Sequence, residues 1–376
     1  MCTTENKKTK VTQVFRYAYP HIGGIESLIE VINESLPTEE FEKEVVCCSN
    51  TENSSIENGV KYNRAKYLCE FASNNISLDF IWKLHKVDTD ILHYHMPCIF
   101  AVLAHFIARP KYKRLYVTYH SDITIYTNLM KYFWGIYRKF INKADKIFVH
   151  TPHHISSSEF LKPFADKCVI IPHGIDIDYK FDKQKVEAIR EKYHGKKILF
   201  SLGRHVKYKG FIYAIEAMKN IENAVYLLGG SGKLTDEFKV FINENNLQEK
   251  VILLGHIPDE ELNNYYEACD VYLFPSVGKT ENYGLAQLQA MRHSKPVINT
   301  RLKNGVNYVS IDKETGITVE PENVEQLTNA INELINNDEL RLYYGQNARK
   351  RVEQLFDVEK VKDKYIEFYK TGVENV

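Results

Sequence analysis

The sequence predicts an α/β protein made of two doubly wound domains, and three observations lead to this prediction. Short apolar runs alternate with helical segments of roughly ten to fifteen residues, the pattern of parallel sheets covered by helices. The twelve runs form two groups of six, separated by a polar stretch near residues 176–196. The length of 376 residues agrees with two domains of common size.

We place the first domain at residues 1–178 and the second at 179–356, and we expect the C-terminal helix, 357–376, to pack back on the first. The strands expected in the first domain are Val11–Tyr17, Glu44–Cys48, Ile91–His95, Leu115–Tyr119, Lys146–His150 and Val169–Ile171. Those expected in the second domain are Lys197–Leu202, Ala224–Gly229, Val251–Leu254, Val271–Phe274, Pro296–Asn299 and Gly316–Val319.

Charge and composition exclude several classes of protein. Lys and Arg number 49, as do Asp and Glu, and this balance argues against a dedicated nucleic-acid binder. Residues 1–10 lack the apolar core of a signal peptide, and the eleven-residue apolar run Cys98–Ala108 is too short to span a bilayer. Seven scattered cysteines fit a reduced compartment. We therefore expect a cytoplasmic protein with neither a disulfide framework nor a cysteine zinc site.

A glycine pair follows the first expected strand. Gly23 and Gly24 precede an amphipathic helix that we expect from Ser27. Paired glycines let the backbone approach a ligand closely and permit positive φ, but from the glycine pair alone a plain strand-to-helix turn is the favoured explanation. The dinucleotide fingerprint G-x-G-x-x-G is missing at this turn.

Basic residues and glycines follow the first strand of the second domain. In the segment 201–210, Gly203 and Gly210 enclose Arg204 and Lys209. Arginine offers a planar fork to phosphate oxygens and lysine a point charge, although both could be solvated loop charges. Gly230 belongs to a second glycine turn at the end of the next strand.

A carboxylate stands at a later strand-to-helix boundary. A strand ends at Pro275, and we expect a helix to begin around Asn282, directly after Glu281. Glu281 could interact with the helix dipole, or it could accept hydrogen bonds from sugar hydroxyls while the following N–H groups hold a phosphate. These two explanations stay open from the residues alone.

Taken together, these motifs resemble those of the retaining nucleotide-sugar glycosyltransferases of family 4. The motifs are Gly23–Glu26, the pairs Gly203–Arg204 and Lys209–Gly210, and the segment Glu281–Met291. Ile171–Asp176 and Tyr119–Asp122 are similar to two further segments of that family. The resemblance covers residues 11 to 356, and it is closest to O-antigen and capsule enzymes, mannosyltransferases among them. It implies the GT-B fold, in which two Rossmann-like domains face each other across a cleft.

The resemblance also implies roles for individual residues. Arg204 and Lys209 would compensate the charge of the donor diphosphate, Glu281 would hold hydroxyls of the donor sugar, and His120 would lie beside that sugar. These four residues form the expected catalytic set. The expected donor-binding residues are Gly23, Gly24, Gly203, Arg204, Lys209, Gly230, His256, Glu281, Asn282, Tyr283, Gly284, Leu285 and Gln289. No metal or cofactor is expected, since Arg and Lys supply the positive charge.

One position departs from the family pattern. Eight residues after the first glutamate the family usually has a second glutamate, which holds the donor ribose, and this chain has Gln289. An amide can accept from one hydroxyl and donate to another, so donor affinity or nucleotide preference is affected more than the reaction class.

Two patterns could suggest a metal site. The D-x-D sequence Asp88-Thr89-Asp90 precedes an expected strand, and we interpret it as a turn. His93 and His95 share one face of that strand and could bind a metal, but they lack an evident carboxylate or cysteine partner. We favour buried or site-lining histidines.

Residues 109–146 carry nine cations against two acids, interleaved with aromatic residues. Such a segment can bind an anionic membrane surface, or its aromatic residues can pack on the core of the first domain; both remain open.

We therefore expect a retaining hexosyltransferase that uses a UDP- or GDP-linked sugar and a glycan or lipid-linked oligosaccharide acceptor, in the cytoplasm and peripherally at the membrane. A nucleotide-sugar-binding module with weakened catalysis is the alternative that Gln289 suggests. A second alternative is a GT-B phosphorylase or sucrose-type synthase, for which the chain is short and lacks an apparent pyridoxal-binding lysine signature.

Overall fold

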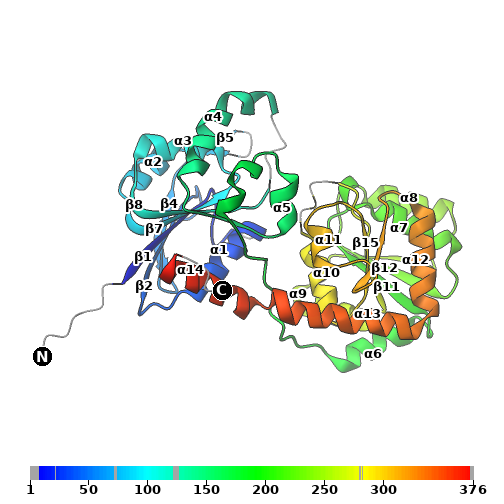
Figure 1. The fold of residues 1–376 in the computed structure, drawn as a ribbon. Helices are drawn as coiled ribbons and strands as arrows, with labels where there is room; N and C mark the ends of the chain where they lie inside the picture. Colours follow the sequence, from blue (N-terminus) through cyan, green and yellow to red (C-terminus); the bar gives the residue numbers. More distant parts are fainter. Residues whose placement is uncertain are drawn as a thin grey trace, which may run out of the picture. The chain divides into compact units, whose positions relative to one another are not determined.

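The computed structural model describes residues 8–21, 23–71, 74–121, 127–278, 281 and 283–372. The chain folds into two compact units, residues 1–173 with 359–376, and residues 174–358 (Figure 1). Each unit contains a mainly parallel sheet with helices packed against it, and the predicted α/β class is confirmed.

The first unit is built on an eight-stranded sheet with the order β10-β9-β8-β7-β1-β2-β4-β3. Neighbouring strands pair in parallel, except that β3 is antiparallel to β4 at one edge. A separate antiparallel pair joins β5 and β6. The strands are β1 (Thr9–Val14), β2 (Phe41–Cys48), β3 (Ser55–Glu57), β4 (Val60–Ala65), β5 (Cys69–Phe71), β6 (Asn74–Ile76), β7 (Asp88–Met96), β8 (Lys111–Tyr119), β9 (Lys146–Val149) and β10 (Cys168–Ile170).

The helices of the first unit include one from the C-terminal end of the chain. They are α1 (Gly24–Ser35), α2 (Leu78–His85), α3 (Ile99–Ala108), α4 (Thr127–Lys143), α5 (Pro152–Ser157), the 3-10 helix Lys162–Lys167, and α14 (Val358–Thr371). Helix α14 lies near α1 (Figure 1). Its apolar side chains, among them Val361 and Phe368, are buried with Leu28 and Ile32 of α1. The last helix is therefore part of the core of the first unit.

The second unit has a six-stranded parallel sheet with the order β13-β12-β11-β14-β15-β16. Its strands are β11 (Lys197–Leu202), β12 (Ala224–Gly229), β13 (Val251–Gly255), β14 (Val271–Phe274), β15 (Val297–Thr300) and β16 (Gly316–Val319). Its helices are α6 (Lys183–Lys192), α7 (Phe211–Ala217), α8 (Thr235–Glu244), α9 (Asp259–Ala268), α10 (Leu285–Arg292), α11 (Gly305–Val309), α12 (Val324–Asn336) and α13 (Asp338–Arg351), with 3-10 turns at Lys207–Lys209 and Met218–Asn220 and a π-helix at Val352–Phe356.

All twelve expected strands are present, but some local predictions were wrong. The segment Asp88–Asp90 is part of β7 rather than a turn, because Asp88 and Thr89 pair with β8 and Asp90 forms an ion pair with Lys113 at 2.7 Å. Helix α1 begins at Gly24, three residues before the expected start. Helix α10 begins at Leu285 rather than around Asn282, after a glycine with positive φ.

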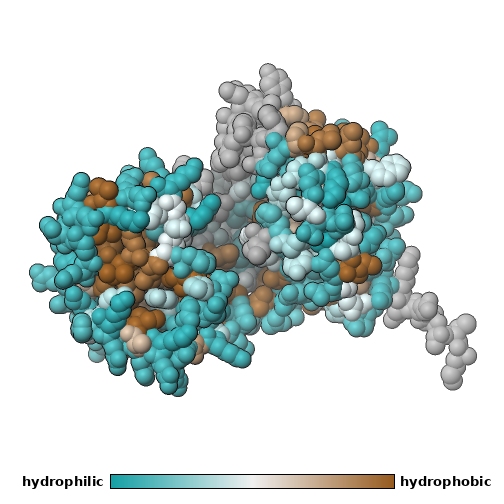
Figure 2. Space-filling model, turned by 180° about the vertical axis from the view of Figure 1, so that it is seen from behind, coloured by the Kyte–Doolittle hydropathy of each residue, from teal (hydrophilic) through white to brown (hydrophobic). Residues whose placement is uncertain are grey.

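The surface is mostly hydrophilic in the view of Figure 2, and hydrophobic residues reach it in a few separate areas. A helix with the length and the apolar composition needed to cross a membrane is not found in the part of the chain that the structure describes.

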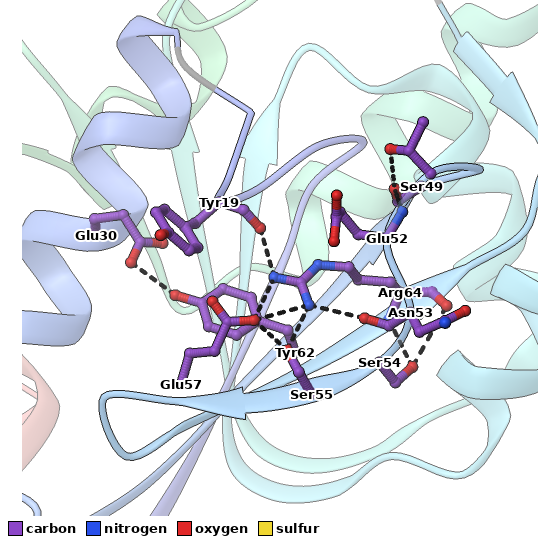
Figure 3. A network of polar contacts seen from close by, with 11 residues as sticks. Tyr19, Glu30, Ser49, Glu52, Asn53, Ser54, Ser55, Glu57, Tyr62 and Arg64 are labelled. Atoms are coloured by element: carbon purple, nitrogen blue, oxygen red, sulfur yellow. Dashed lines mark hydrogen bonds and ion pairs between the residues drawn. The ribbon is translucent and has the colours of Figure 1, made fainter.

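A buried arginine holds the turn after β1 in place. The Arg64 side chain on β4 is only 3% exposed, and its guanidinium donates to the Tyr19 carbonyl at 2.6 Å and to the Asn53 carbonyl at 2.9 Å (Figure 3). It also pairs with Glu57 on β3 at 3.2 Å. Because Tyr19 lies in the turn that leads to Gly23, Arg64 ties the start of that turn to the edge of the sheet.

Replacing this arginine should destabilise the first unit. We expect Arg64→Met to lower the free energy of unfolding by about 2 kcal/mol, because two carbonyls and a partly exposed carboxylate lose their donor. Urea unfolding followed by circular dichroism measures the change. Lys61→Met is the matched control, since Lys61 is a largely exposed cation on the same strand. Equal stability of the two variants would contradict a structural role for Arg64.

Candidate functional site

The candidate site of the second unit lies at the carboxyl ends of β12, β11 and β14, which are neighbours in the sheet. In parallel sheets, ligands bind at this edge, where loops and helix N-termini converge. Gly203, Arg204 and Lys209 follow β11, Gly230 follows β12, and Glu281 follows β14. The topology therefore brings together residues as far apart in the sequence as Gly203 and Glu281.

Lys209 and Glu281 form a direct ion pair. Lys209 Nζ lies 2.5 Å from Glu281 Oε2, and the side chains are only 14% and 11% exposed. Ser276 Oγ donates a second hydrogen bond to the same carboxylate oxygen at 3.2 Å, and Asn304 Nδ2 donates to the Glu281 carbonyl at 2.5 Å. The residue expected at the diphosphate and the residue expected at the sugar are thus in contact.

Backbone hydrogen bonds join the two loops that carry this ion pair. The N–H of Val277 donates to the Tyr208 carbonyl at 2.8 Å. Gly210 has φ +65°, and a Cβ there would lie 2.0 Å from the carbonyl oxygen of Pro275. The close approach of the loops therefore requires a glycine at this position.

Arg204 is exposed, whereas Lys209 of the same motif is largely buried. Its guanidinium donates to the Tyr208 hydroxyl at 3.4 Å. Lys209 Nζ, by contrast, lies 5.2 Å from the ring centroid of Phe274 and 5.5 Å from that of Tyr208. Lys209 is thus held by its surroundings, whereas the end of Arg204 is accessible to a ligand.

The two glycine turns of this edge pack against each other. Gly230 has φ +104°, and a Cβ there would lie 2.0 Å from the carbonyl oxygen of Gly203. A side chain at Gly230 would therefore force the loops after β11 and β12 apart. Gly284, with φ +77°, precedes α10 and touches Phe274, where a Cβ would come within 2.7 Å of the ring.

A pocket of about 400 Å³ opens beside α10, within the size range of small-ligand sites. Gln289 is half-buried and lines it, as does the exposed Leu285. Its wall also carries opposite charges, Asp259 on α9 and Arg292 on α10. The full lining is Leu202, Asp259, Leu262, Asn263, Tyr266, Leu285, Ala286, Gln289 and Arg292.

The remaining expected donor-binding residues of this unit have different placements. Tyr283 is 6% exposed and packs edge-on against Phe356, which indicates a structural side chain. His256 is exposed in the loop between β13 and α9 and is not among the residues that line the pocket. Asn282 lies outside the described residues.

The glycine pair of the first unit provides space rather than an unusual backbone conformation. Gly23 caps α1 with φ −171°, an extended value that any residue adopts, and Gly24 is the first residue of the helix. A Cβ on Gly23 would lie 2.3 Å from a carboxylate oxygen of Glu26, whereas one on Gly24 would meet no atom within 4 Å. Neither of these two glycines therefore uses the positive φ that glycine permits.

His120 belongs to a chain of buried imidazoles at the carboxyl ends of β7, β8 and β9. His120 Nε2 lies 3.3 Å from His95 Nδ1, and His120 Nδ1 lies 3.0 Å from His150 Nε2. Burial lowers the pKa of His95 to about 3 and lowers the pKa values of His120 and His150 well below the usual histidine value. These rings are neutral at physiological pH.

His93 and His95 are both fully buried, as we favoured. His93 contacts Thr118 Oγ1 at 2.8 Å and the Tyr369 hydroxyl at 2.5 Å. His95 Nε2 contacts Gln13 Oε1 at 2.9 Å. Sequence reasoning did not single out His150 as a neighbour of His120, because only the order of strands places their ends side by side.

The aromatic residues of α4 pack inward where the structure describes them. Tyr137 and Phe140 are buried in the core of the first unit, while Arg138 and Lys139 are exposed. Trp134 is 38% exposed. The packing alternative is thus confirmed for two of the aromatic residues, and membrane contact through the other face stays a prediction.

Comparison with known proteins identifies the family. The model "Glycosyltransferase Family 4" matches residues 22–179, and the model "Glycosyl transferases group 1" matches residues 182–351. The O-antigen chain mannosyltransferase C of Escherichia coli is 32% identical over 374 residues, covering 97% of this chain and 99% of that protein. The D-rhamnosyltransferase WbpZ of Pseudomonas aeruginosa is 28% identical and covers 90% of each chain.

Solved structures show the same fold at lower identity. Sucrose-phosphate synthase from Thermosynechococcus elongatus superposes with a TM-score of 0.77 at 20% identity, covering 96% of this chain and 98% of that chain. HepE of Anabaena, in complex with UDP, gives a TM-score of 0.75 at 18% identity over 96% of this chain and all of the other. These structural similarities show the fold, and the family models and the E. coli relative show the family. The chain therefore belongs to the family 4 glycosyltransferases, with Rossmann-like domains of the GT-B fold class, and is a transferase.

Proposed function

We propose that this protein is a retaining hexosyltransferase of bacterial surface polysaccharide biosynthesis. It takes a hexose from a UDP- or GDP-linked donor and transfers it to a glycan or lipid-linked oligosaccharide, in the cytoplasm and peripherally at the membrane. The buried contact between Lys209 and Glu281 carries the proposal, because it places a cation and a hydroxyl acceptor side by side at a ligand-binding edge. The whole-length similarity to an O-antigen mannosyltransferase supports the pathway.

In this proposal the positive groups act on the diphosphate. The Arg204 guanidinium donates two hydrogen bonds to phosphate oxygens. Lys209 neutralises the negative charge that develops on the diphosphate as its bond to the sugar breaks. Glu281 accepts hydrogen bonds from donor-sugar hydroxyls, and His120 lies beside that sugar. The acceptor attacks on the face that the diphosphate leaves, and a phosphate oxygen takes the acceptor proton. The transfer uses no metal and no cofactor.

A module that binds nucleotide sugars with weakened turnover is the second candidate, favoured by the neutral Gln289 in the pocket wall. Transfer or donor hydrolysis separates it from the transferase. The phosphorylase or sucrose-type alternative gains no support from sucrose-phosphate synthase, since a likeness at 20% identity carries the fold alone.

Loss of the carboxylate should affect turnover more than nucleotide binding. We expect Glu281→Ala to lower kcat at saturating donor about 100-fold, a loss typical of one removed transition-state contact. The affinity for the free nucleoside diphosphate should change less than about threefold, which is under 1 kcal/mol. Radiolabelled transfer and calorimetry measure the two quantities, with the exposed Glu244→Ala as control. Equal losses in both would indicate a structural role.

Loss of either cation should weaken nucleotide binding. Arg204→Ala and Lys209→Ala should each reduce nucleoside-diphosphate affinity by at least about 1.5 kcal/mol, the lower value for charge-assisted hydrogen bonds. Lys207→Ala is the matched control, because Lys207 is an exposed cation of the same loop. Unchanged calorimetric affinity in both site variants would place the phosphates elsewhere.

Restoring the family carboxylate tests the ribose contact. If Gln289 holds the ribose, Gln289→Glu should strengthen nucleotide binding by about 1 kcal/mol, roughly fivefold, because bonds to a carboxylate are stronger. The gain should disappear with the 2′-deoxyribose nucleotide. Asp259 lines the same pocket and could repel the new charge, so the pair is also measured in an Asp259→Asn background. The ribose contact is rejected if Gln289→Glu strengthens nucleotide binding in neither background and the ribose and 2′-deoxyribose nucleotides bind equally well.

A further inference from the structure

Four of the most exposed apolar side chains of the first unit lie on or next to α2 and α3. Leu68, Leu78, Trp82 and Ile107 are 77%, 73%, 58% and 66% exposed, and we call these four side chains the α2–α3 strip. In Figure 2, hydrophobic residues reach the surface at the upper edge of this unit, where Figure 1 shows α2, α3 and α4. Scattered exposed apolar residues are common in soluble proteins, whereas a contiguous group marks an interaction surface.

Three members of the strip are neighbours at α2. The N–H of Leu68 donates to the Ile76 carbonyl at 2.8 Å, which places Leu68 beside the start of this helix. Leu78 and Trp82 are four residues apart on α2 and therefore share one of its faces. The opposite face carries Phe80, which is buried in the core of the unit.

The fourth member, Ile107, lies on the side of α3 that faces α2. The ring centroids of Phe100 on α3 and Phe80 on α2 are 6.0 Å apart, and Ile107 follows Phe100 by two helical turns on the same side. Nδ1 of His85 lies 2.7 Å from the last carbonyl of α3, and its ring is stacked with that of Trp82 at 6.1 Å. His85 thus connects Trp82 to the end of α3 that carries Ile107, and the strip is contiguous.

Exposed cations lie beside the strip, at the C-terminal ends of α2 and α3. Lys86 Nζ lies 4.7 Å from the ring centroid of Trp82, and Lys143 Nζ lies 5.4 Å from that of Phe106 on α3. Arg109 directly follows α3, and Lys111 begins β8. None of these four cations forms an ion pair with an acid in the part of the chain that the structure describes. An apolar strip beside unpaired cations is complementary to an anionic surface with an apolar interior.

We propose that the α2–α3 strip and these four cations bind the anionic surface of a lipid bilayer. Tryptophan favours the headgroup level, where its ring is buried while its N–H stays near water. Leu78 and Ile107 enter the acyl boundary, and the long basic side chains reach the anionic headgroups. A protein partner would have to supply acids opposite all four cations, whereas mobile anionic headgroups rearrange to meet them.

This proposal rests on the proposed peripheral location at the membrane and names the surface that produces it. It differs from membrane contact through α4, where Trp134 is the exposed aromatic residue. Binding is measured with vesicles that contain neither donor nor acceptor. A negative result therefore leaves the proposed transfer untouched, since transfer is measured separately with a water-soluble acceptor.

The chain has two tryptophans, Trp82 and Trp134, and each can report on its own surface. The full-length variant Trp134→Phe keeps Trp82 as its sole tryptophan, and Trp82→Phe keeps Trp134. With vesicles of equal parts phosphatidylglycerol and phosphatidylcholine, the emission of Trp82 should shift to shorter wavelength and be quenched by brominated acyl chains. Vesicles of phosphatidylcholine alone should leave it unchanged.

Substitutions test the two components of the surface by co-sedimentation with the same anionic vesicles. Ile107→Glu should weaken binding at least about tenfold, because it places a carboxylate in the apolar strip. Lys86→Ser and Arg109→Ser should each weaken it roughly fivefold, since a cation near such a surface contributes about 1 kcal/mol. Leu342→Glu alters an exposed apolar residue of α13 in the second unit and is the matched control. Circular dichroism checks the fold of each variant.

Four results would overturn the proposal. The first is the absence of binding to the anionic vesicles, and the second is binding that Ile107→Glu leaves unchanged. The third is binding that shifts the emission of Trp134 but not that of Trp82, which would assign the lipid contact to α4. The fourth is a dimer in sedimentation velocity that Ile107→Glu dissociates, because the strip would then be an interface between two copies of the chain.

Discussion

The arrangement of the second unit depends on one buried ion pair between Lys209 and Glu281. The two residues follow β11 and β14, which are adjacent strands, and both side chains are largely removed from water. A charge in such surroundings is costly unless it is paired and hydrogen-bonded. Each loop therefore has its place fixed by the other, and the glycine at position 210 lets their backbones come close enough for the pair to form.

In the first unit, most of the buried polar side chains described here are neutral rather than charged. Its central histidines are neutral, because burial lowers their pKa values, and each finds a partner on a neighbouring strand. The deeply buried guanidinium of Arg64 meets two carbonyls and a carboxylate at the sheet edge. Tyr369 of α14 reaches His93, so the end of the chain also takes part in this polar interior.

Apolar runs predicted the twelve central strands because strands buried on both faces are continuous apolar segments. The same signal is absent from β3 to β6, which are short or polar and lie outside that centre; Val60–Ala65, for example, mixes apolar residues with polar and charged ones. Asp88–Asp90 was misinterpreted since acidic residues are typical of turns, yet here they extend β7 beyond the apolar run. Glycine motifs predicted ligand contacts at the carboxyl edge of the second sheet, whereas the contact between Lys209 and Glu281 joins residues 72 positions apart and follows from strand order alone. For the same reason, the neighbourhood of His120 and His150 could not be found from spacing.

In the proposed transfer, the ion pair between Lys209 and Glu281 also lets the donor bind without leaving either charge unpaired. Without a ligand, each charge is neutralised by the other, so neither side chain is left uncompensated in a poorly solvated place. An anion that approaches Lys209 becomes its second negative partner, while Glu281 stays within reach. Hydroxyl groups can then donate hydrogen bonds to the carboxylate oxygens of Glu281, which Lys209 no longer pairs with alone. The exchange never requires a bare buried charge, which keeps the cost of binding low. Ser276 donates to the Glu281 carboxylate, and Asn304 donates to the Glu281 backbone carbonyl. In the proposed transfer, Glu281 therefore stays held when Lys209 turns to the diphosphate.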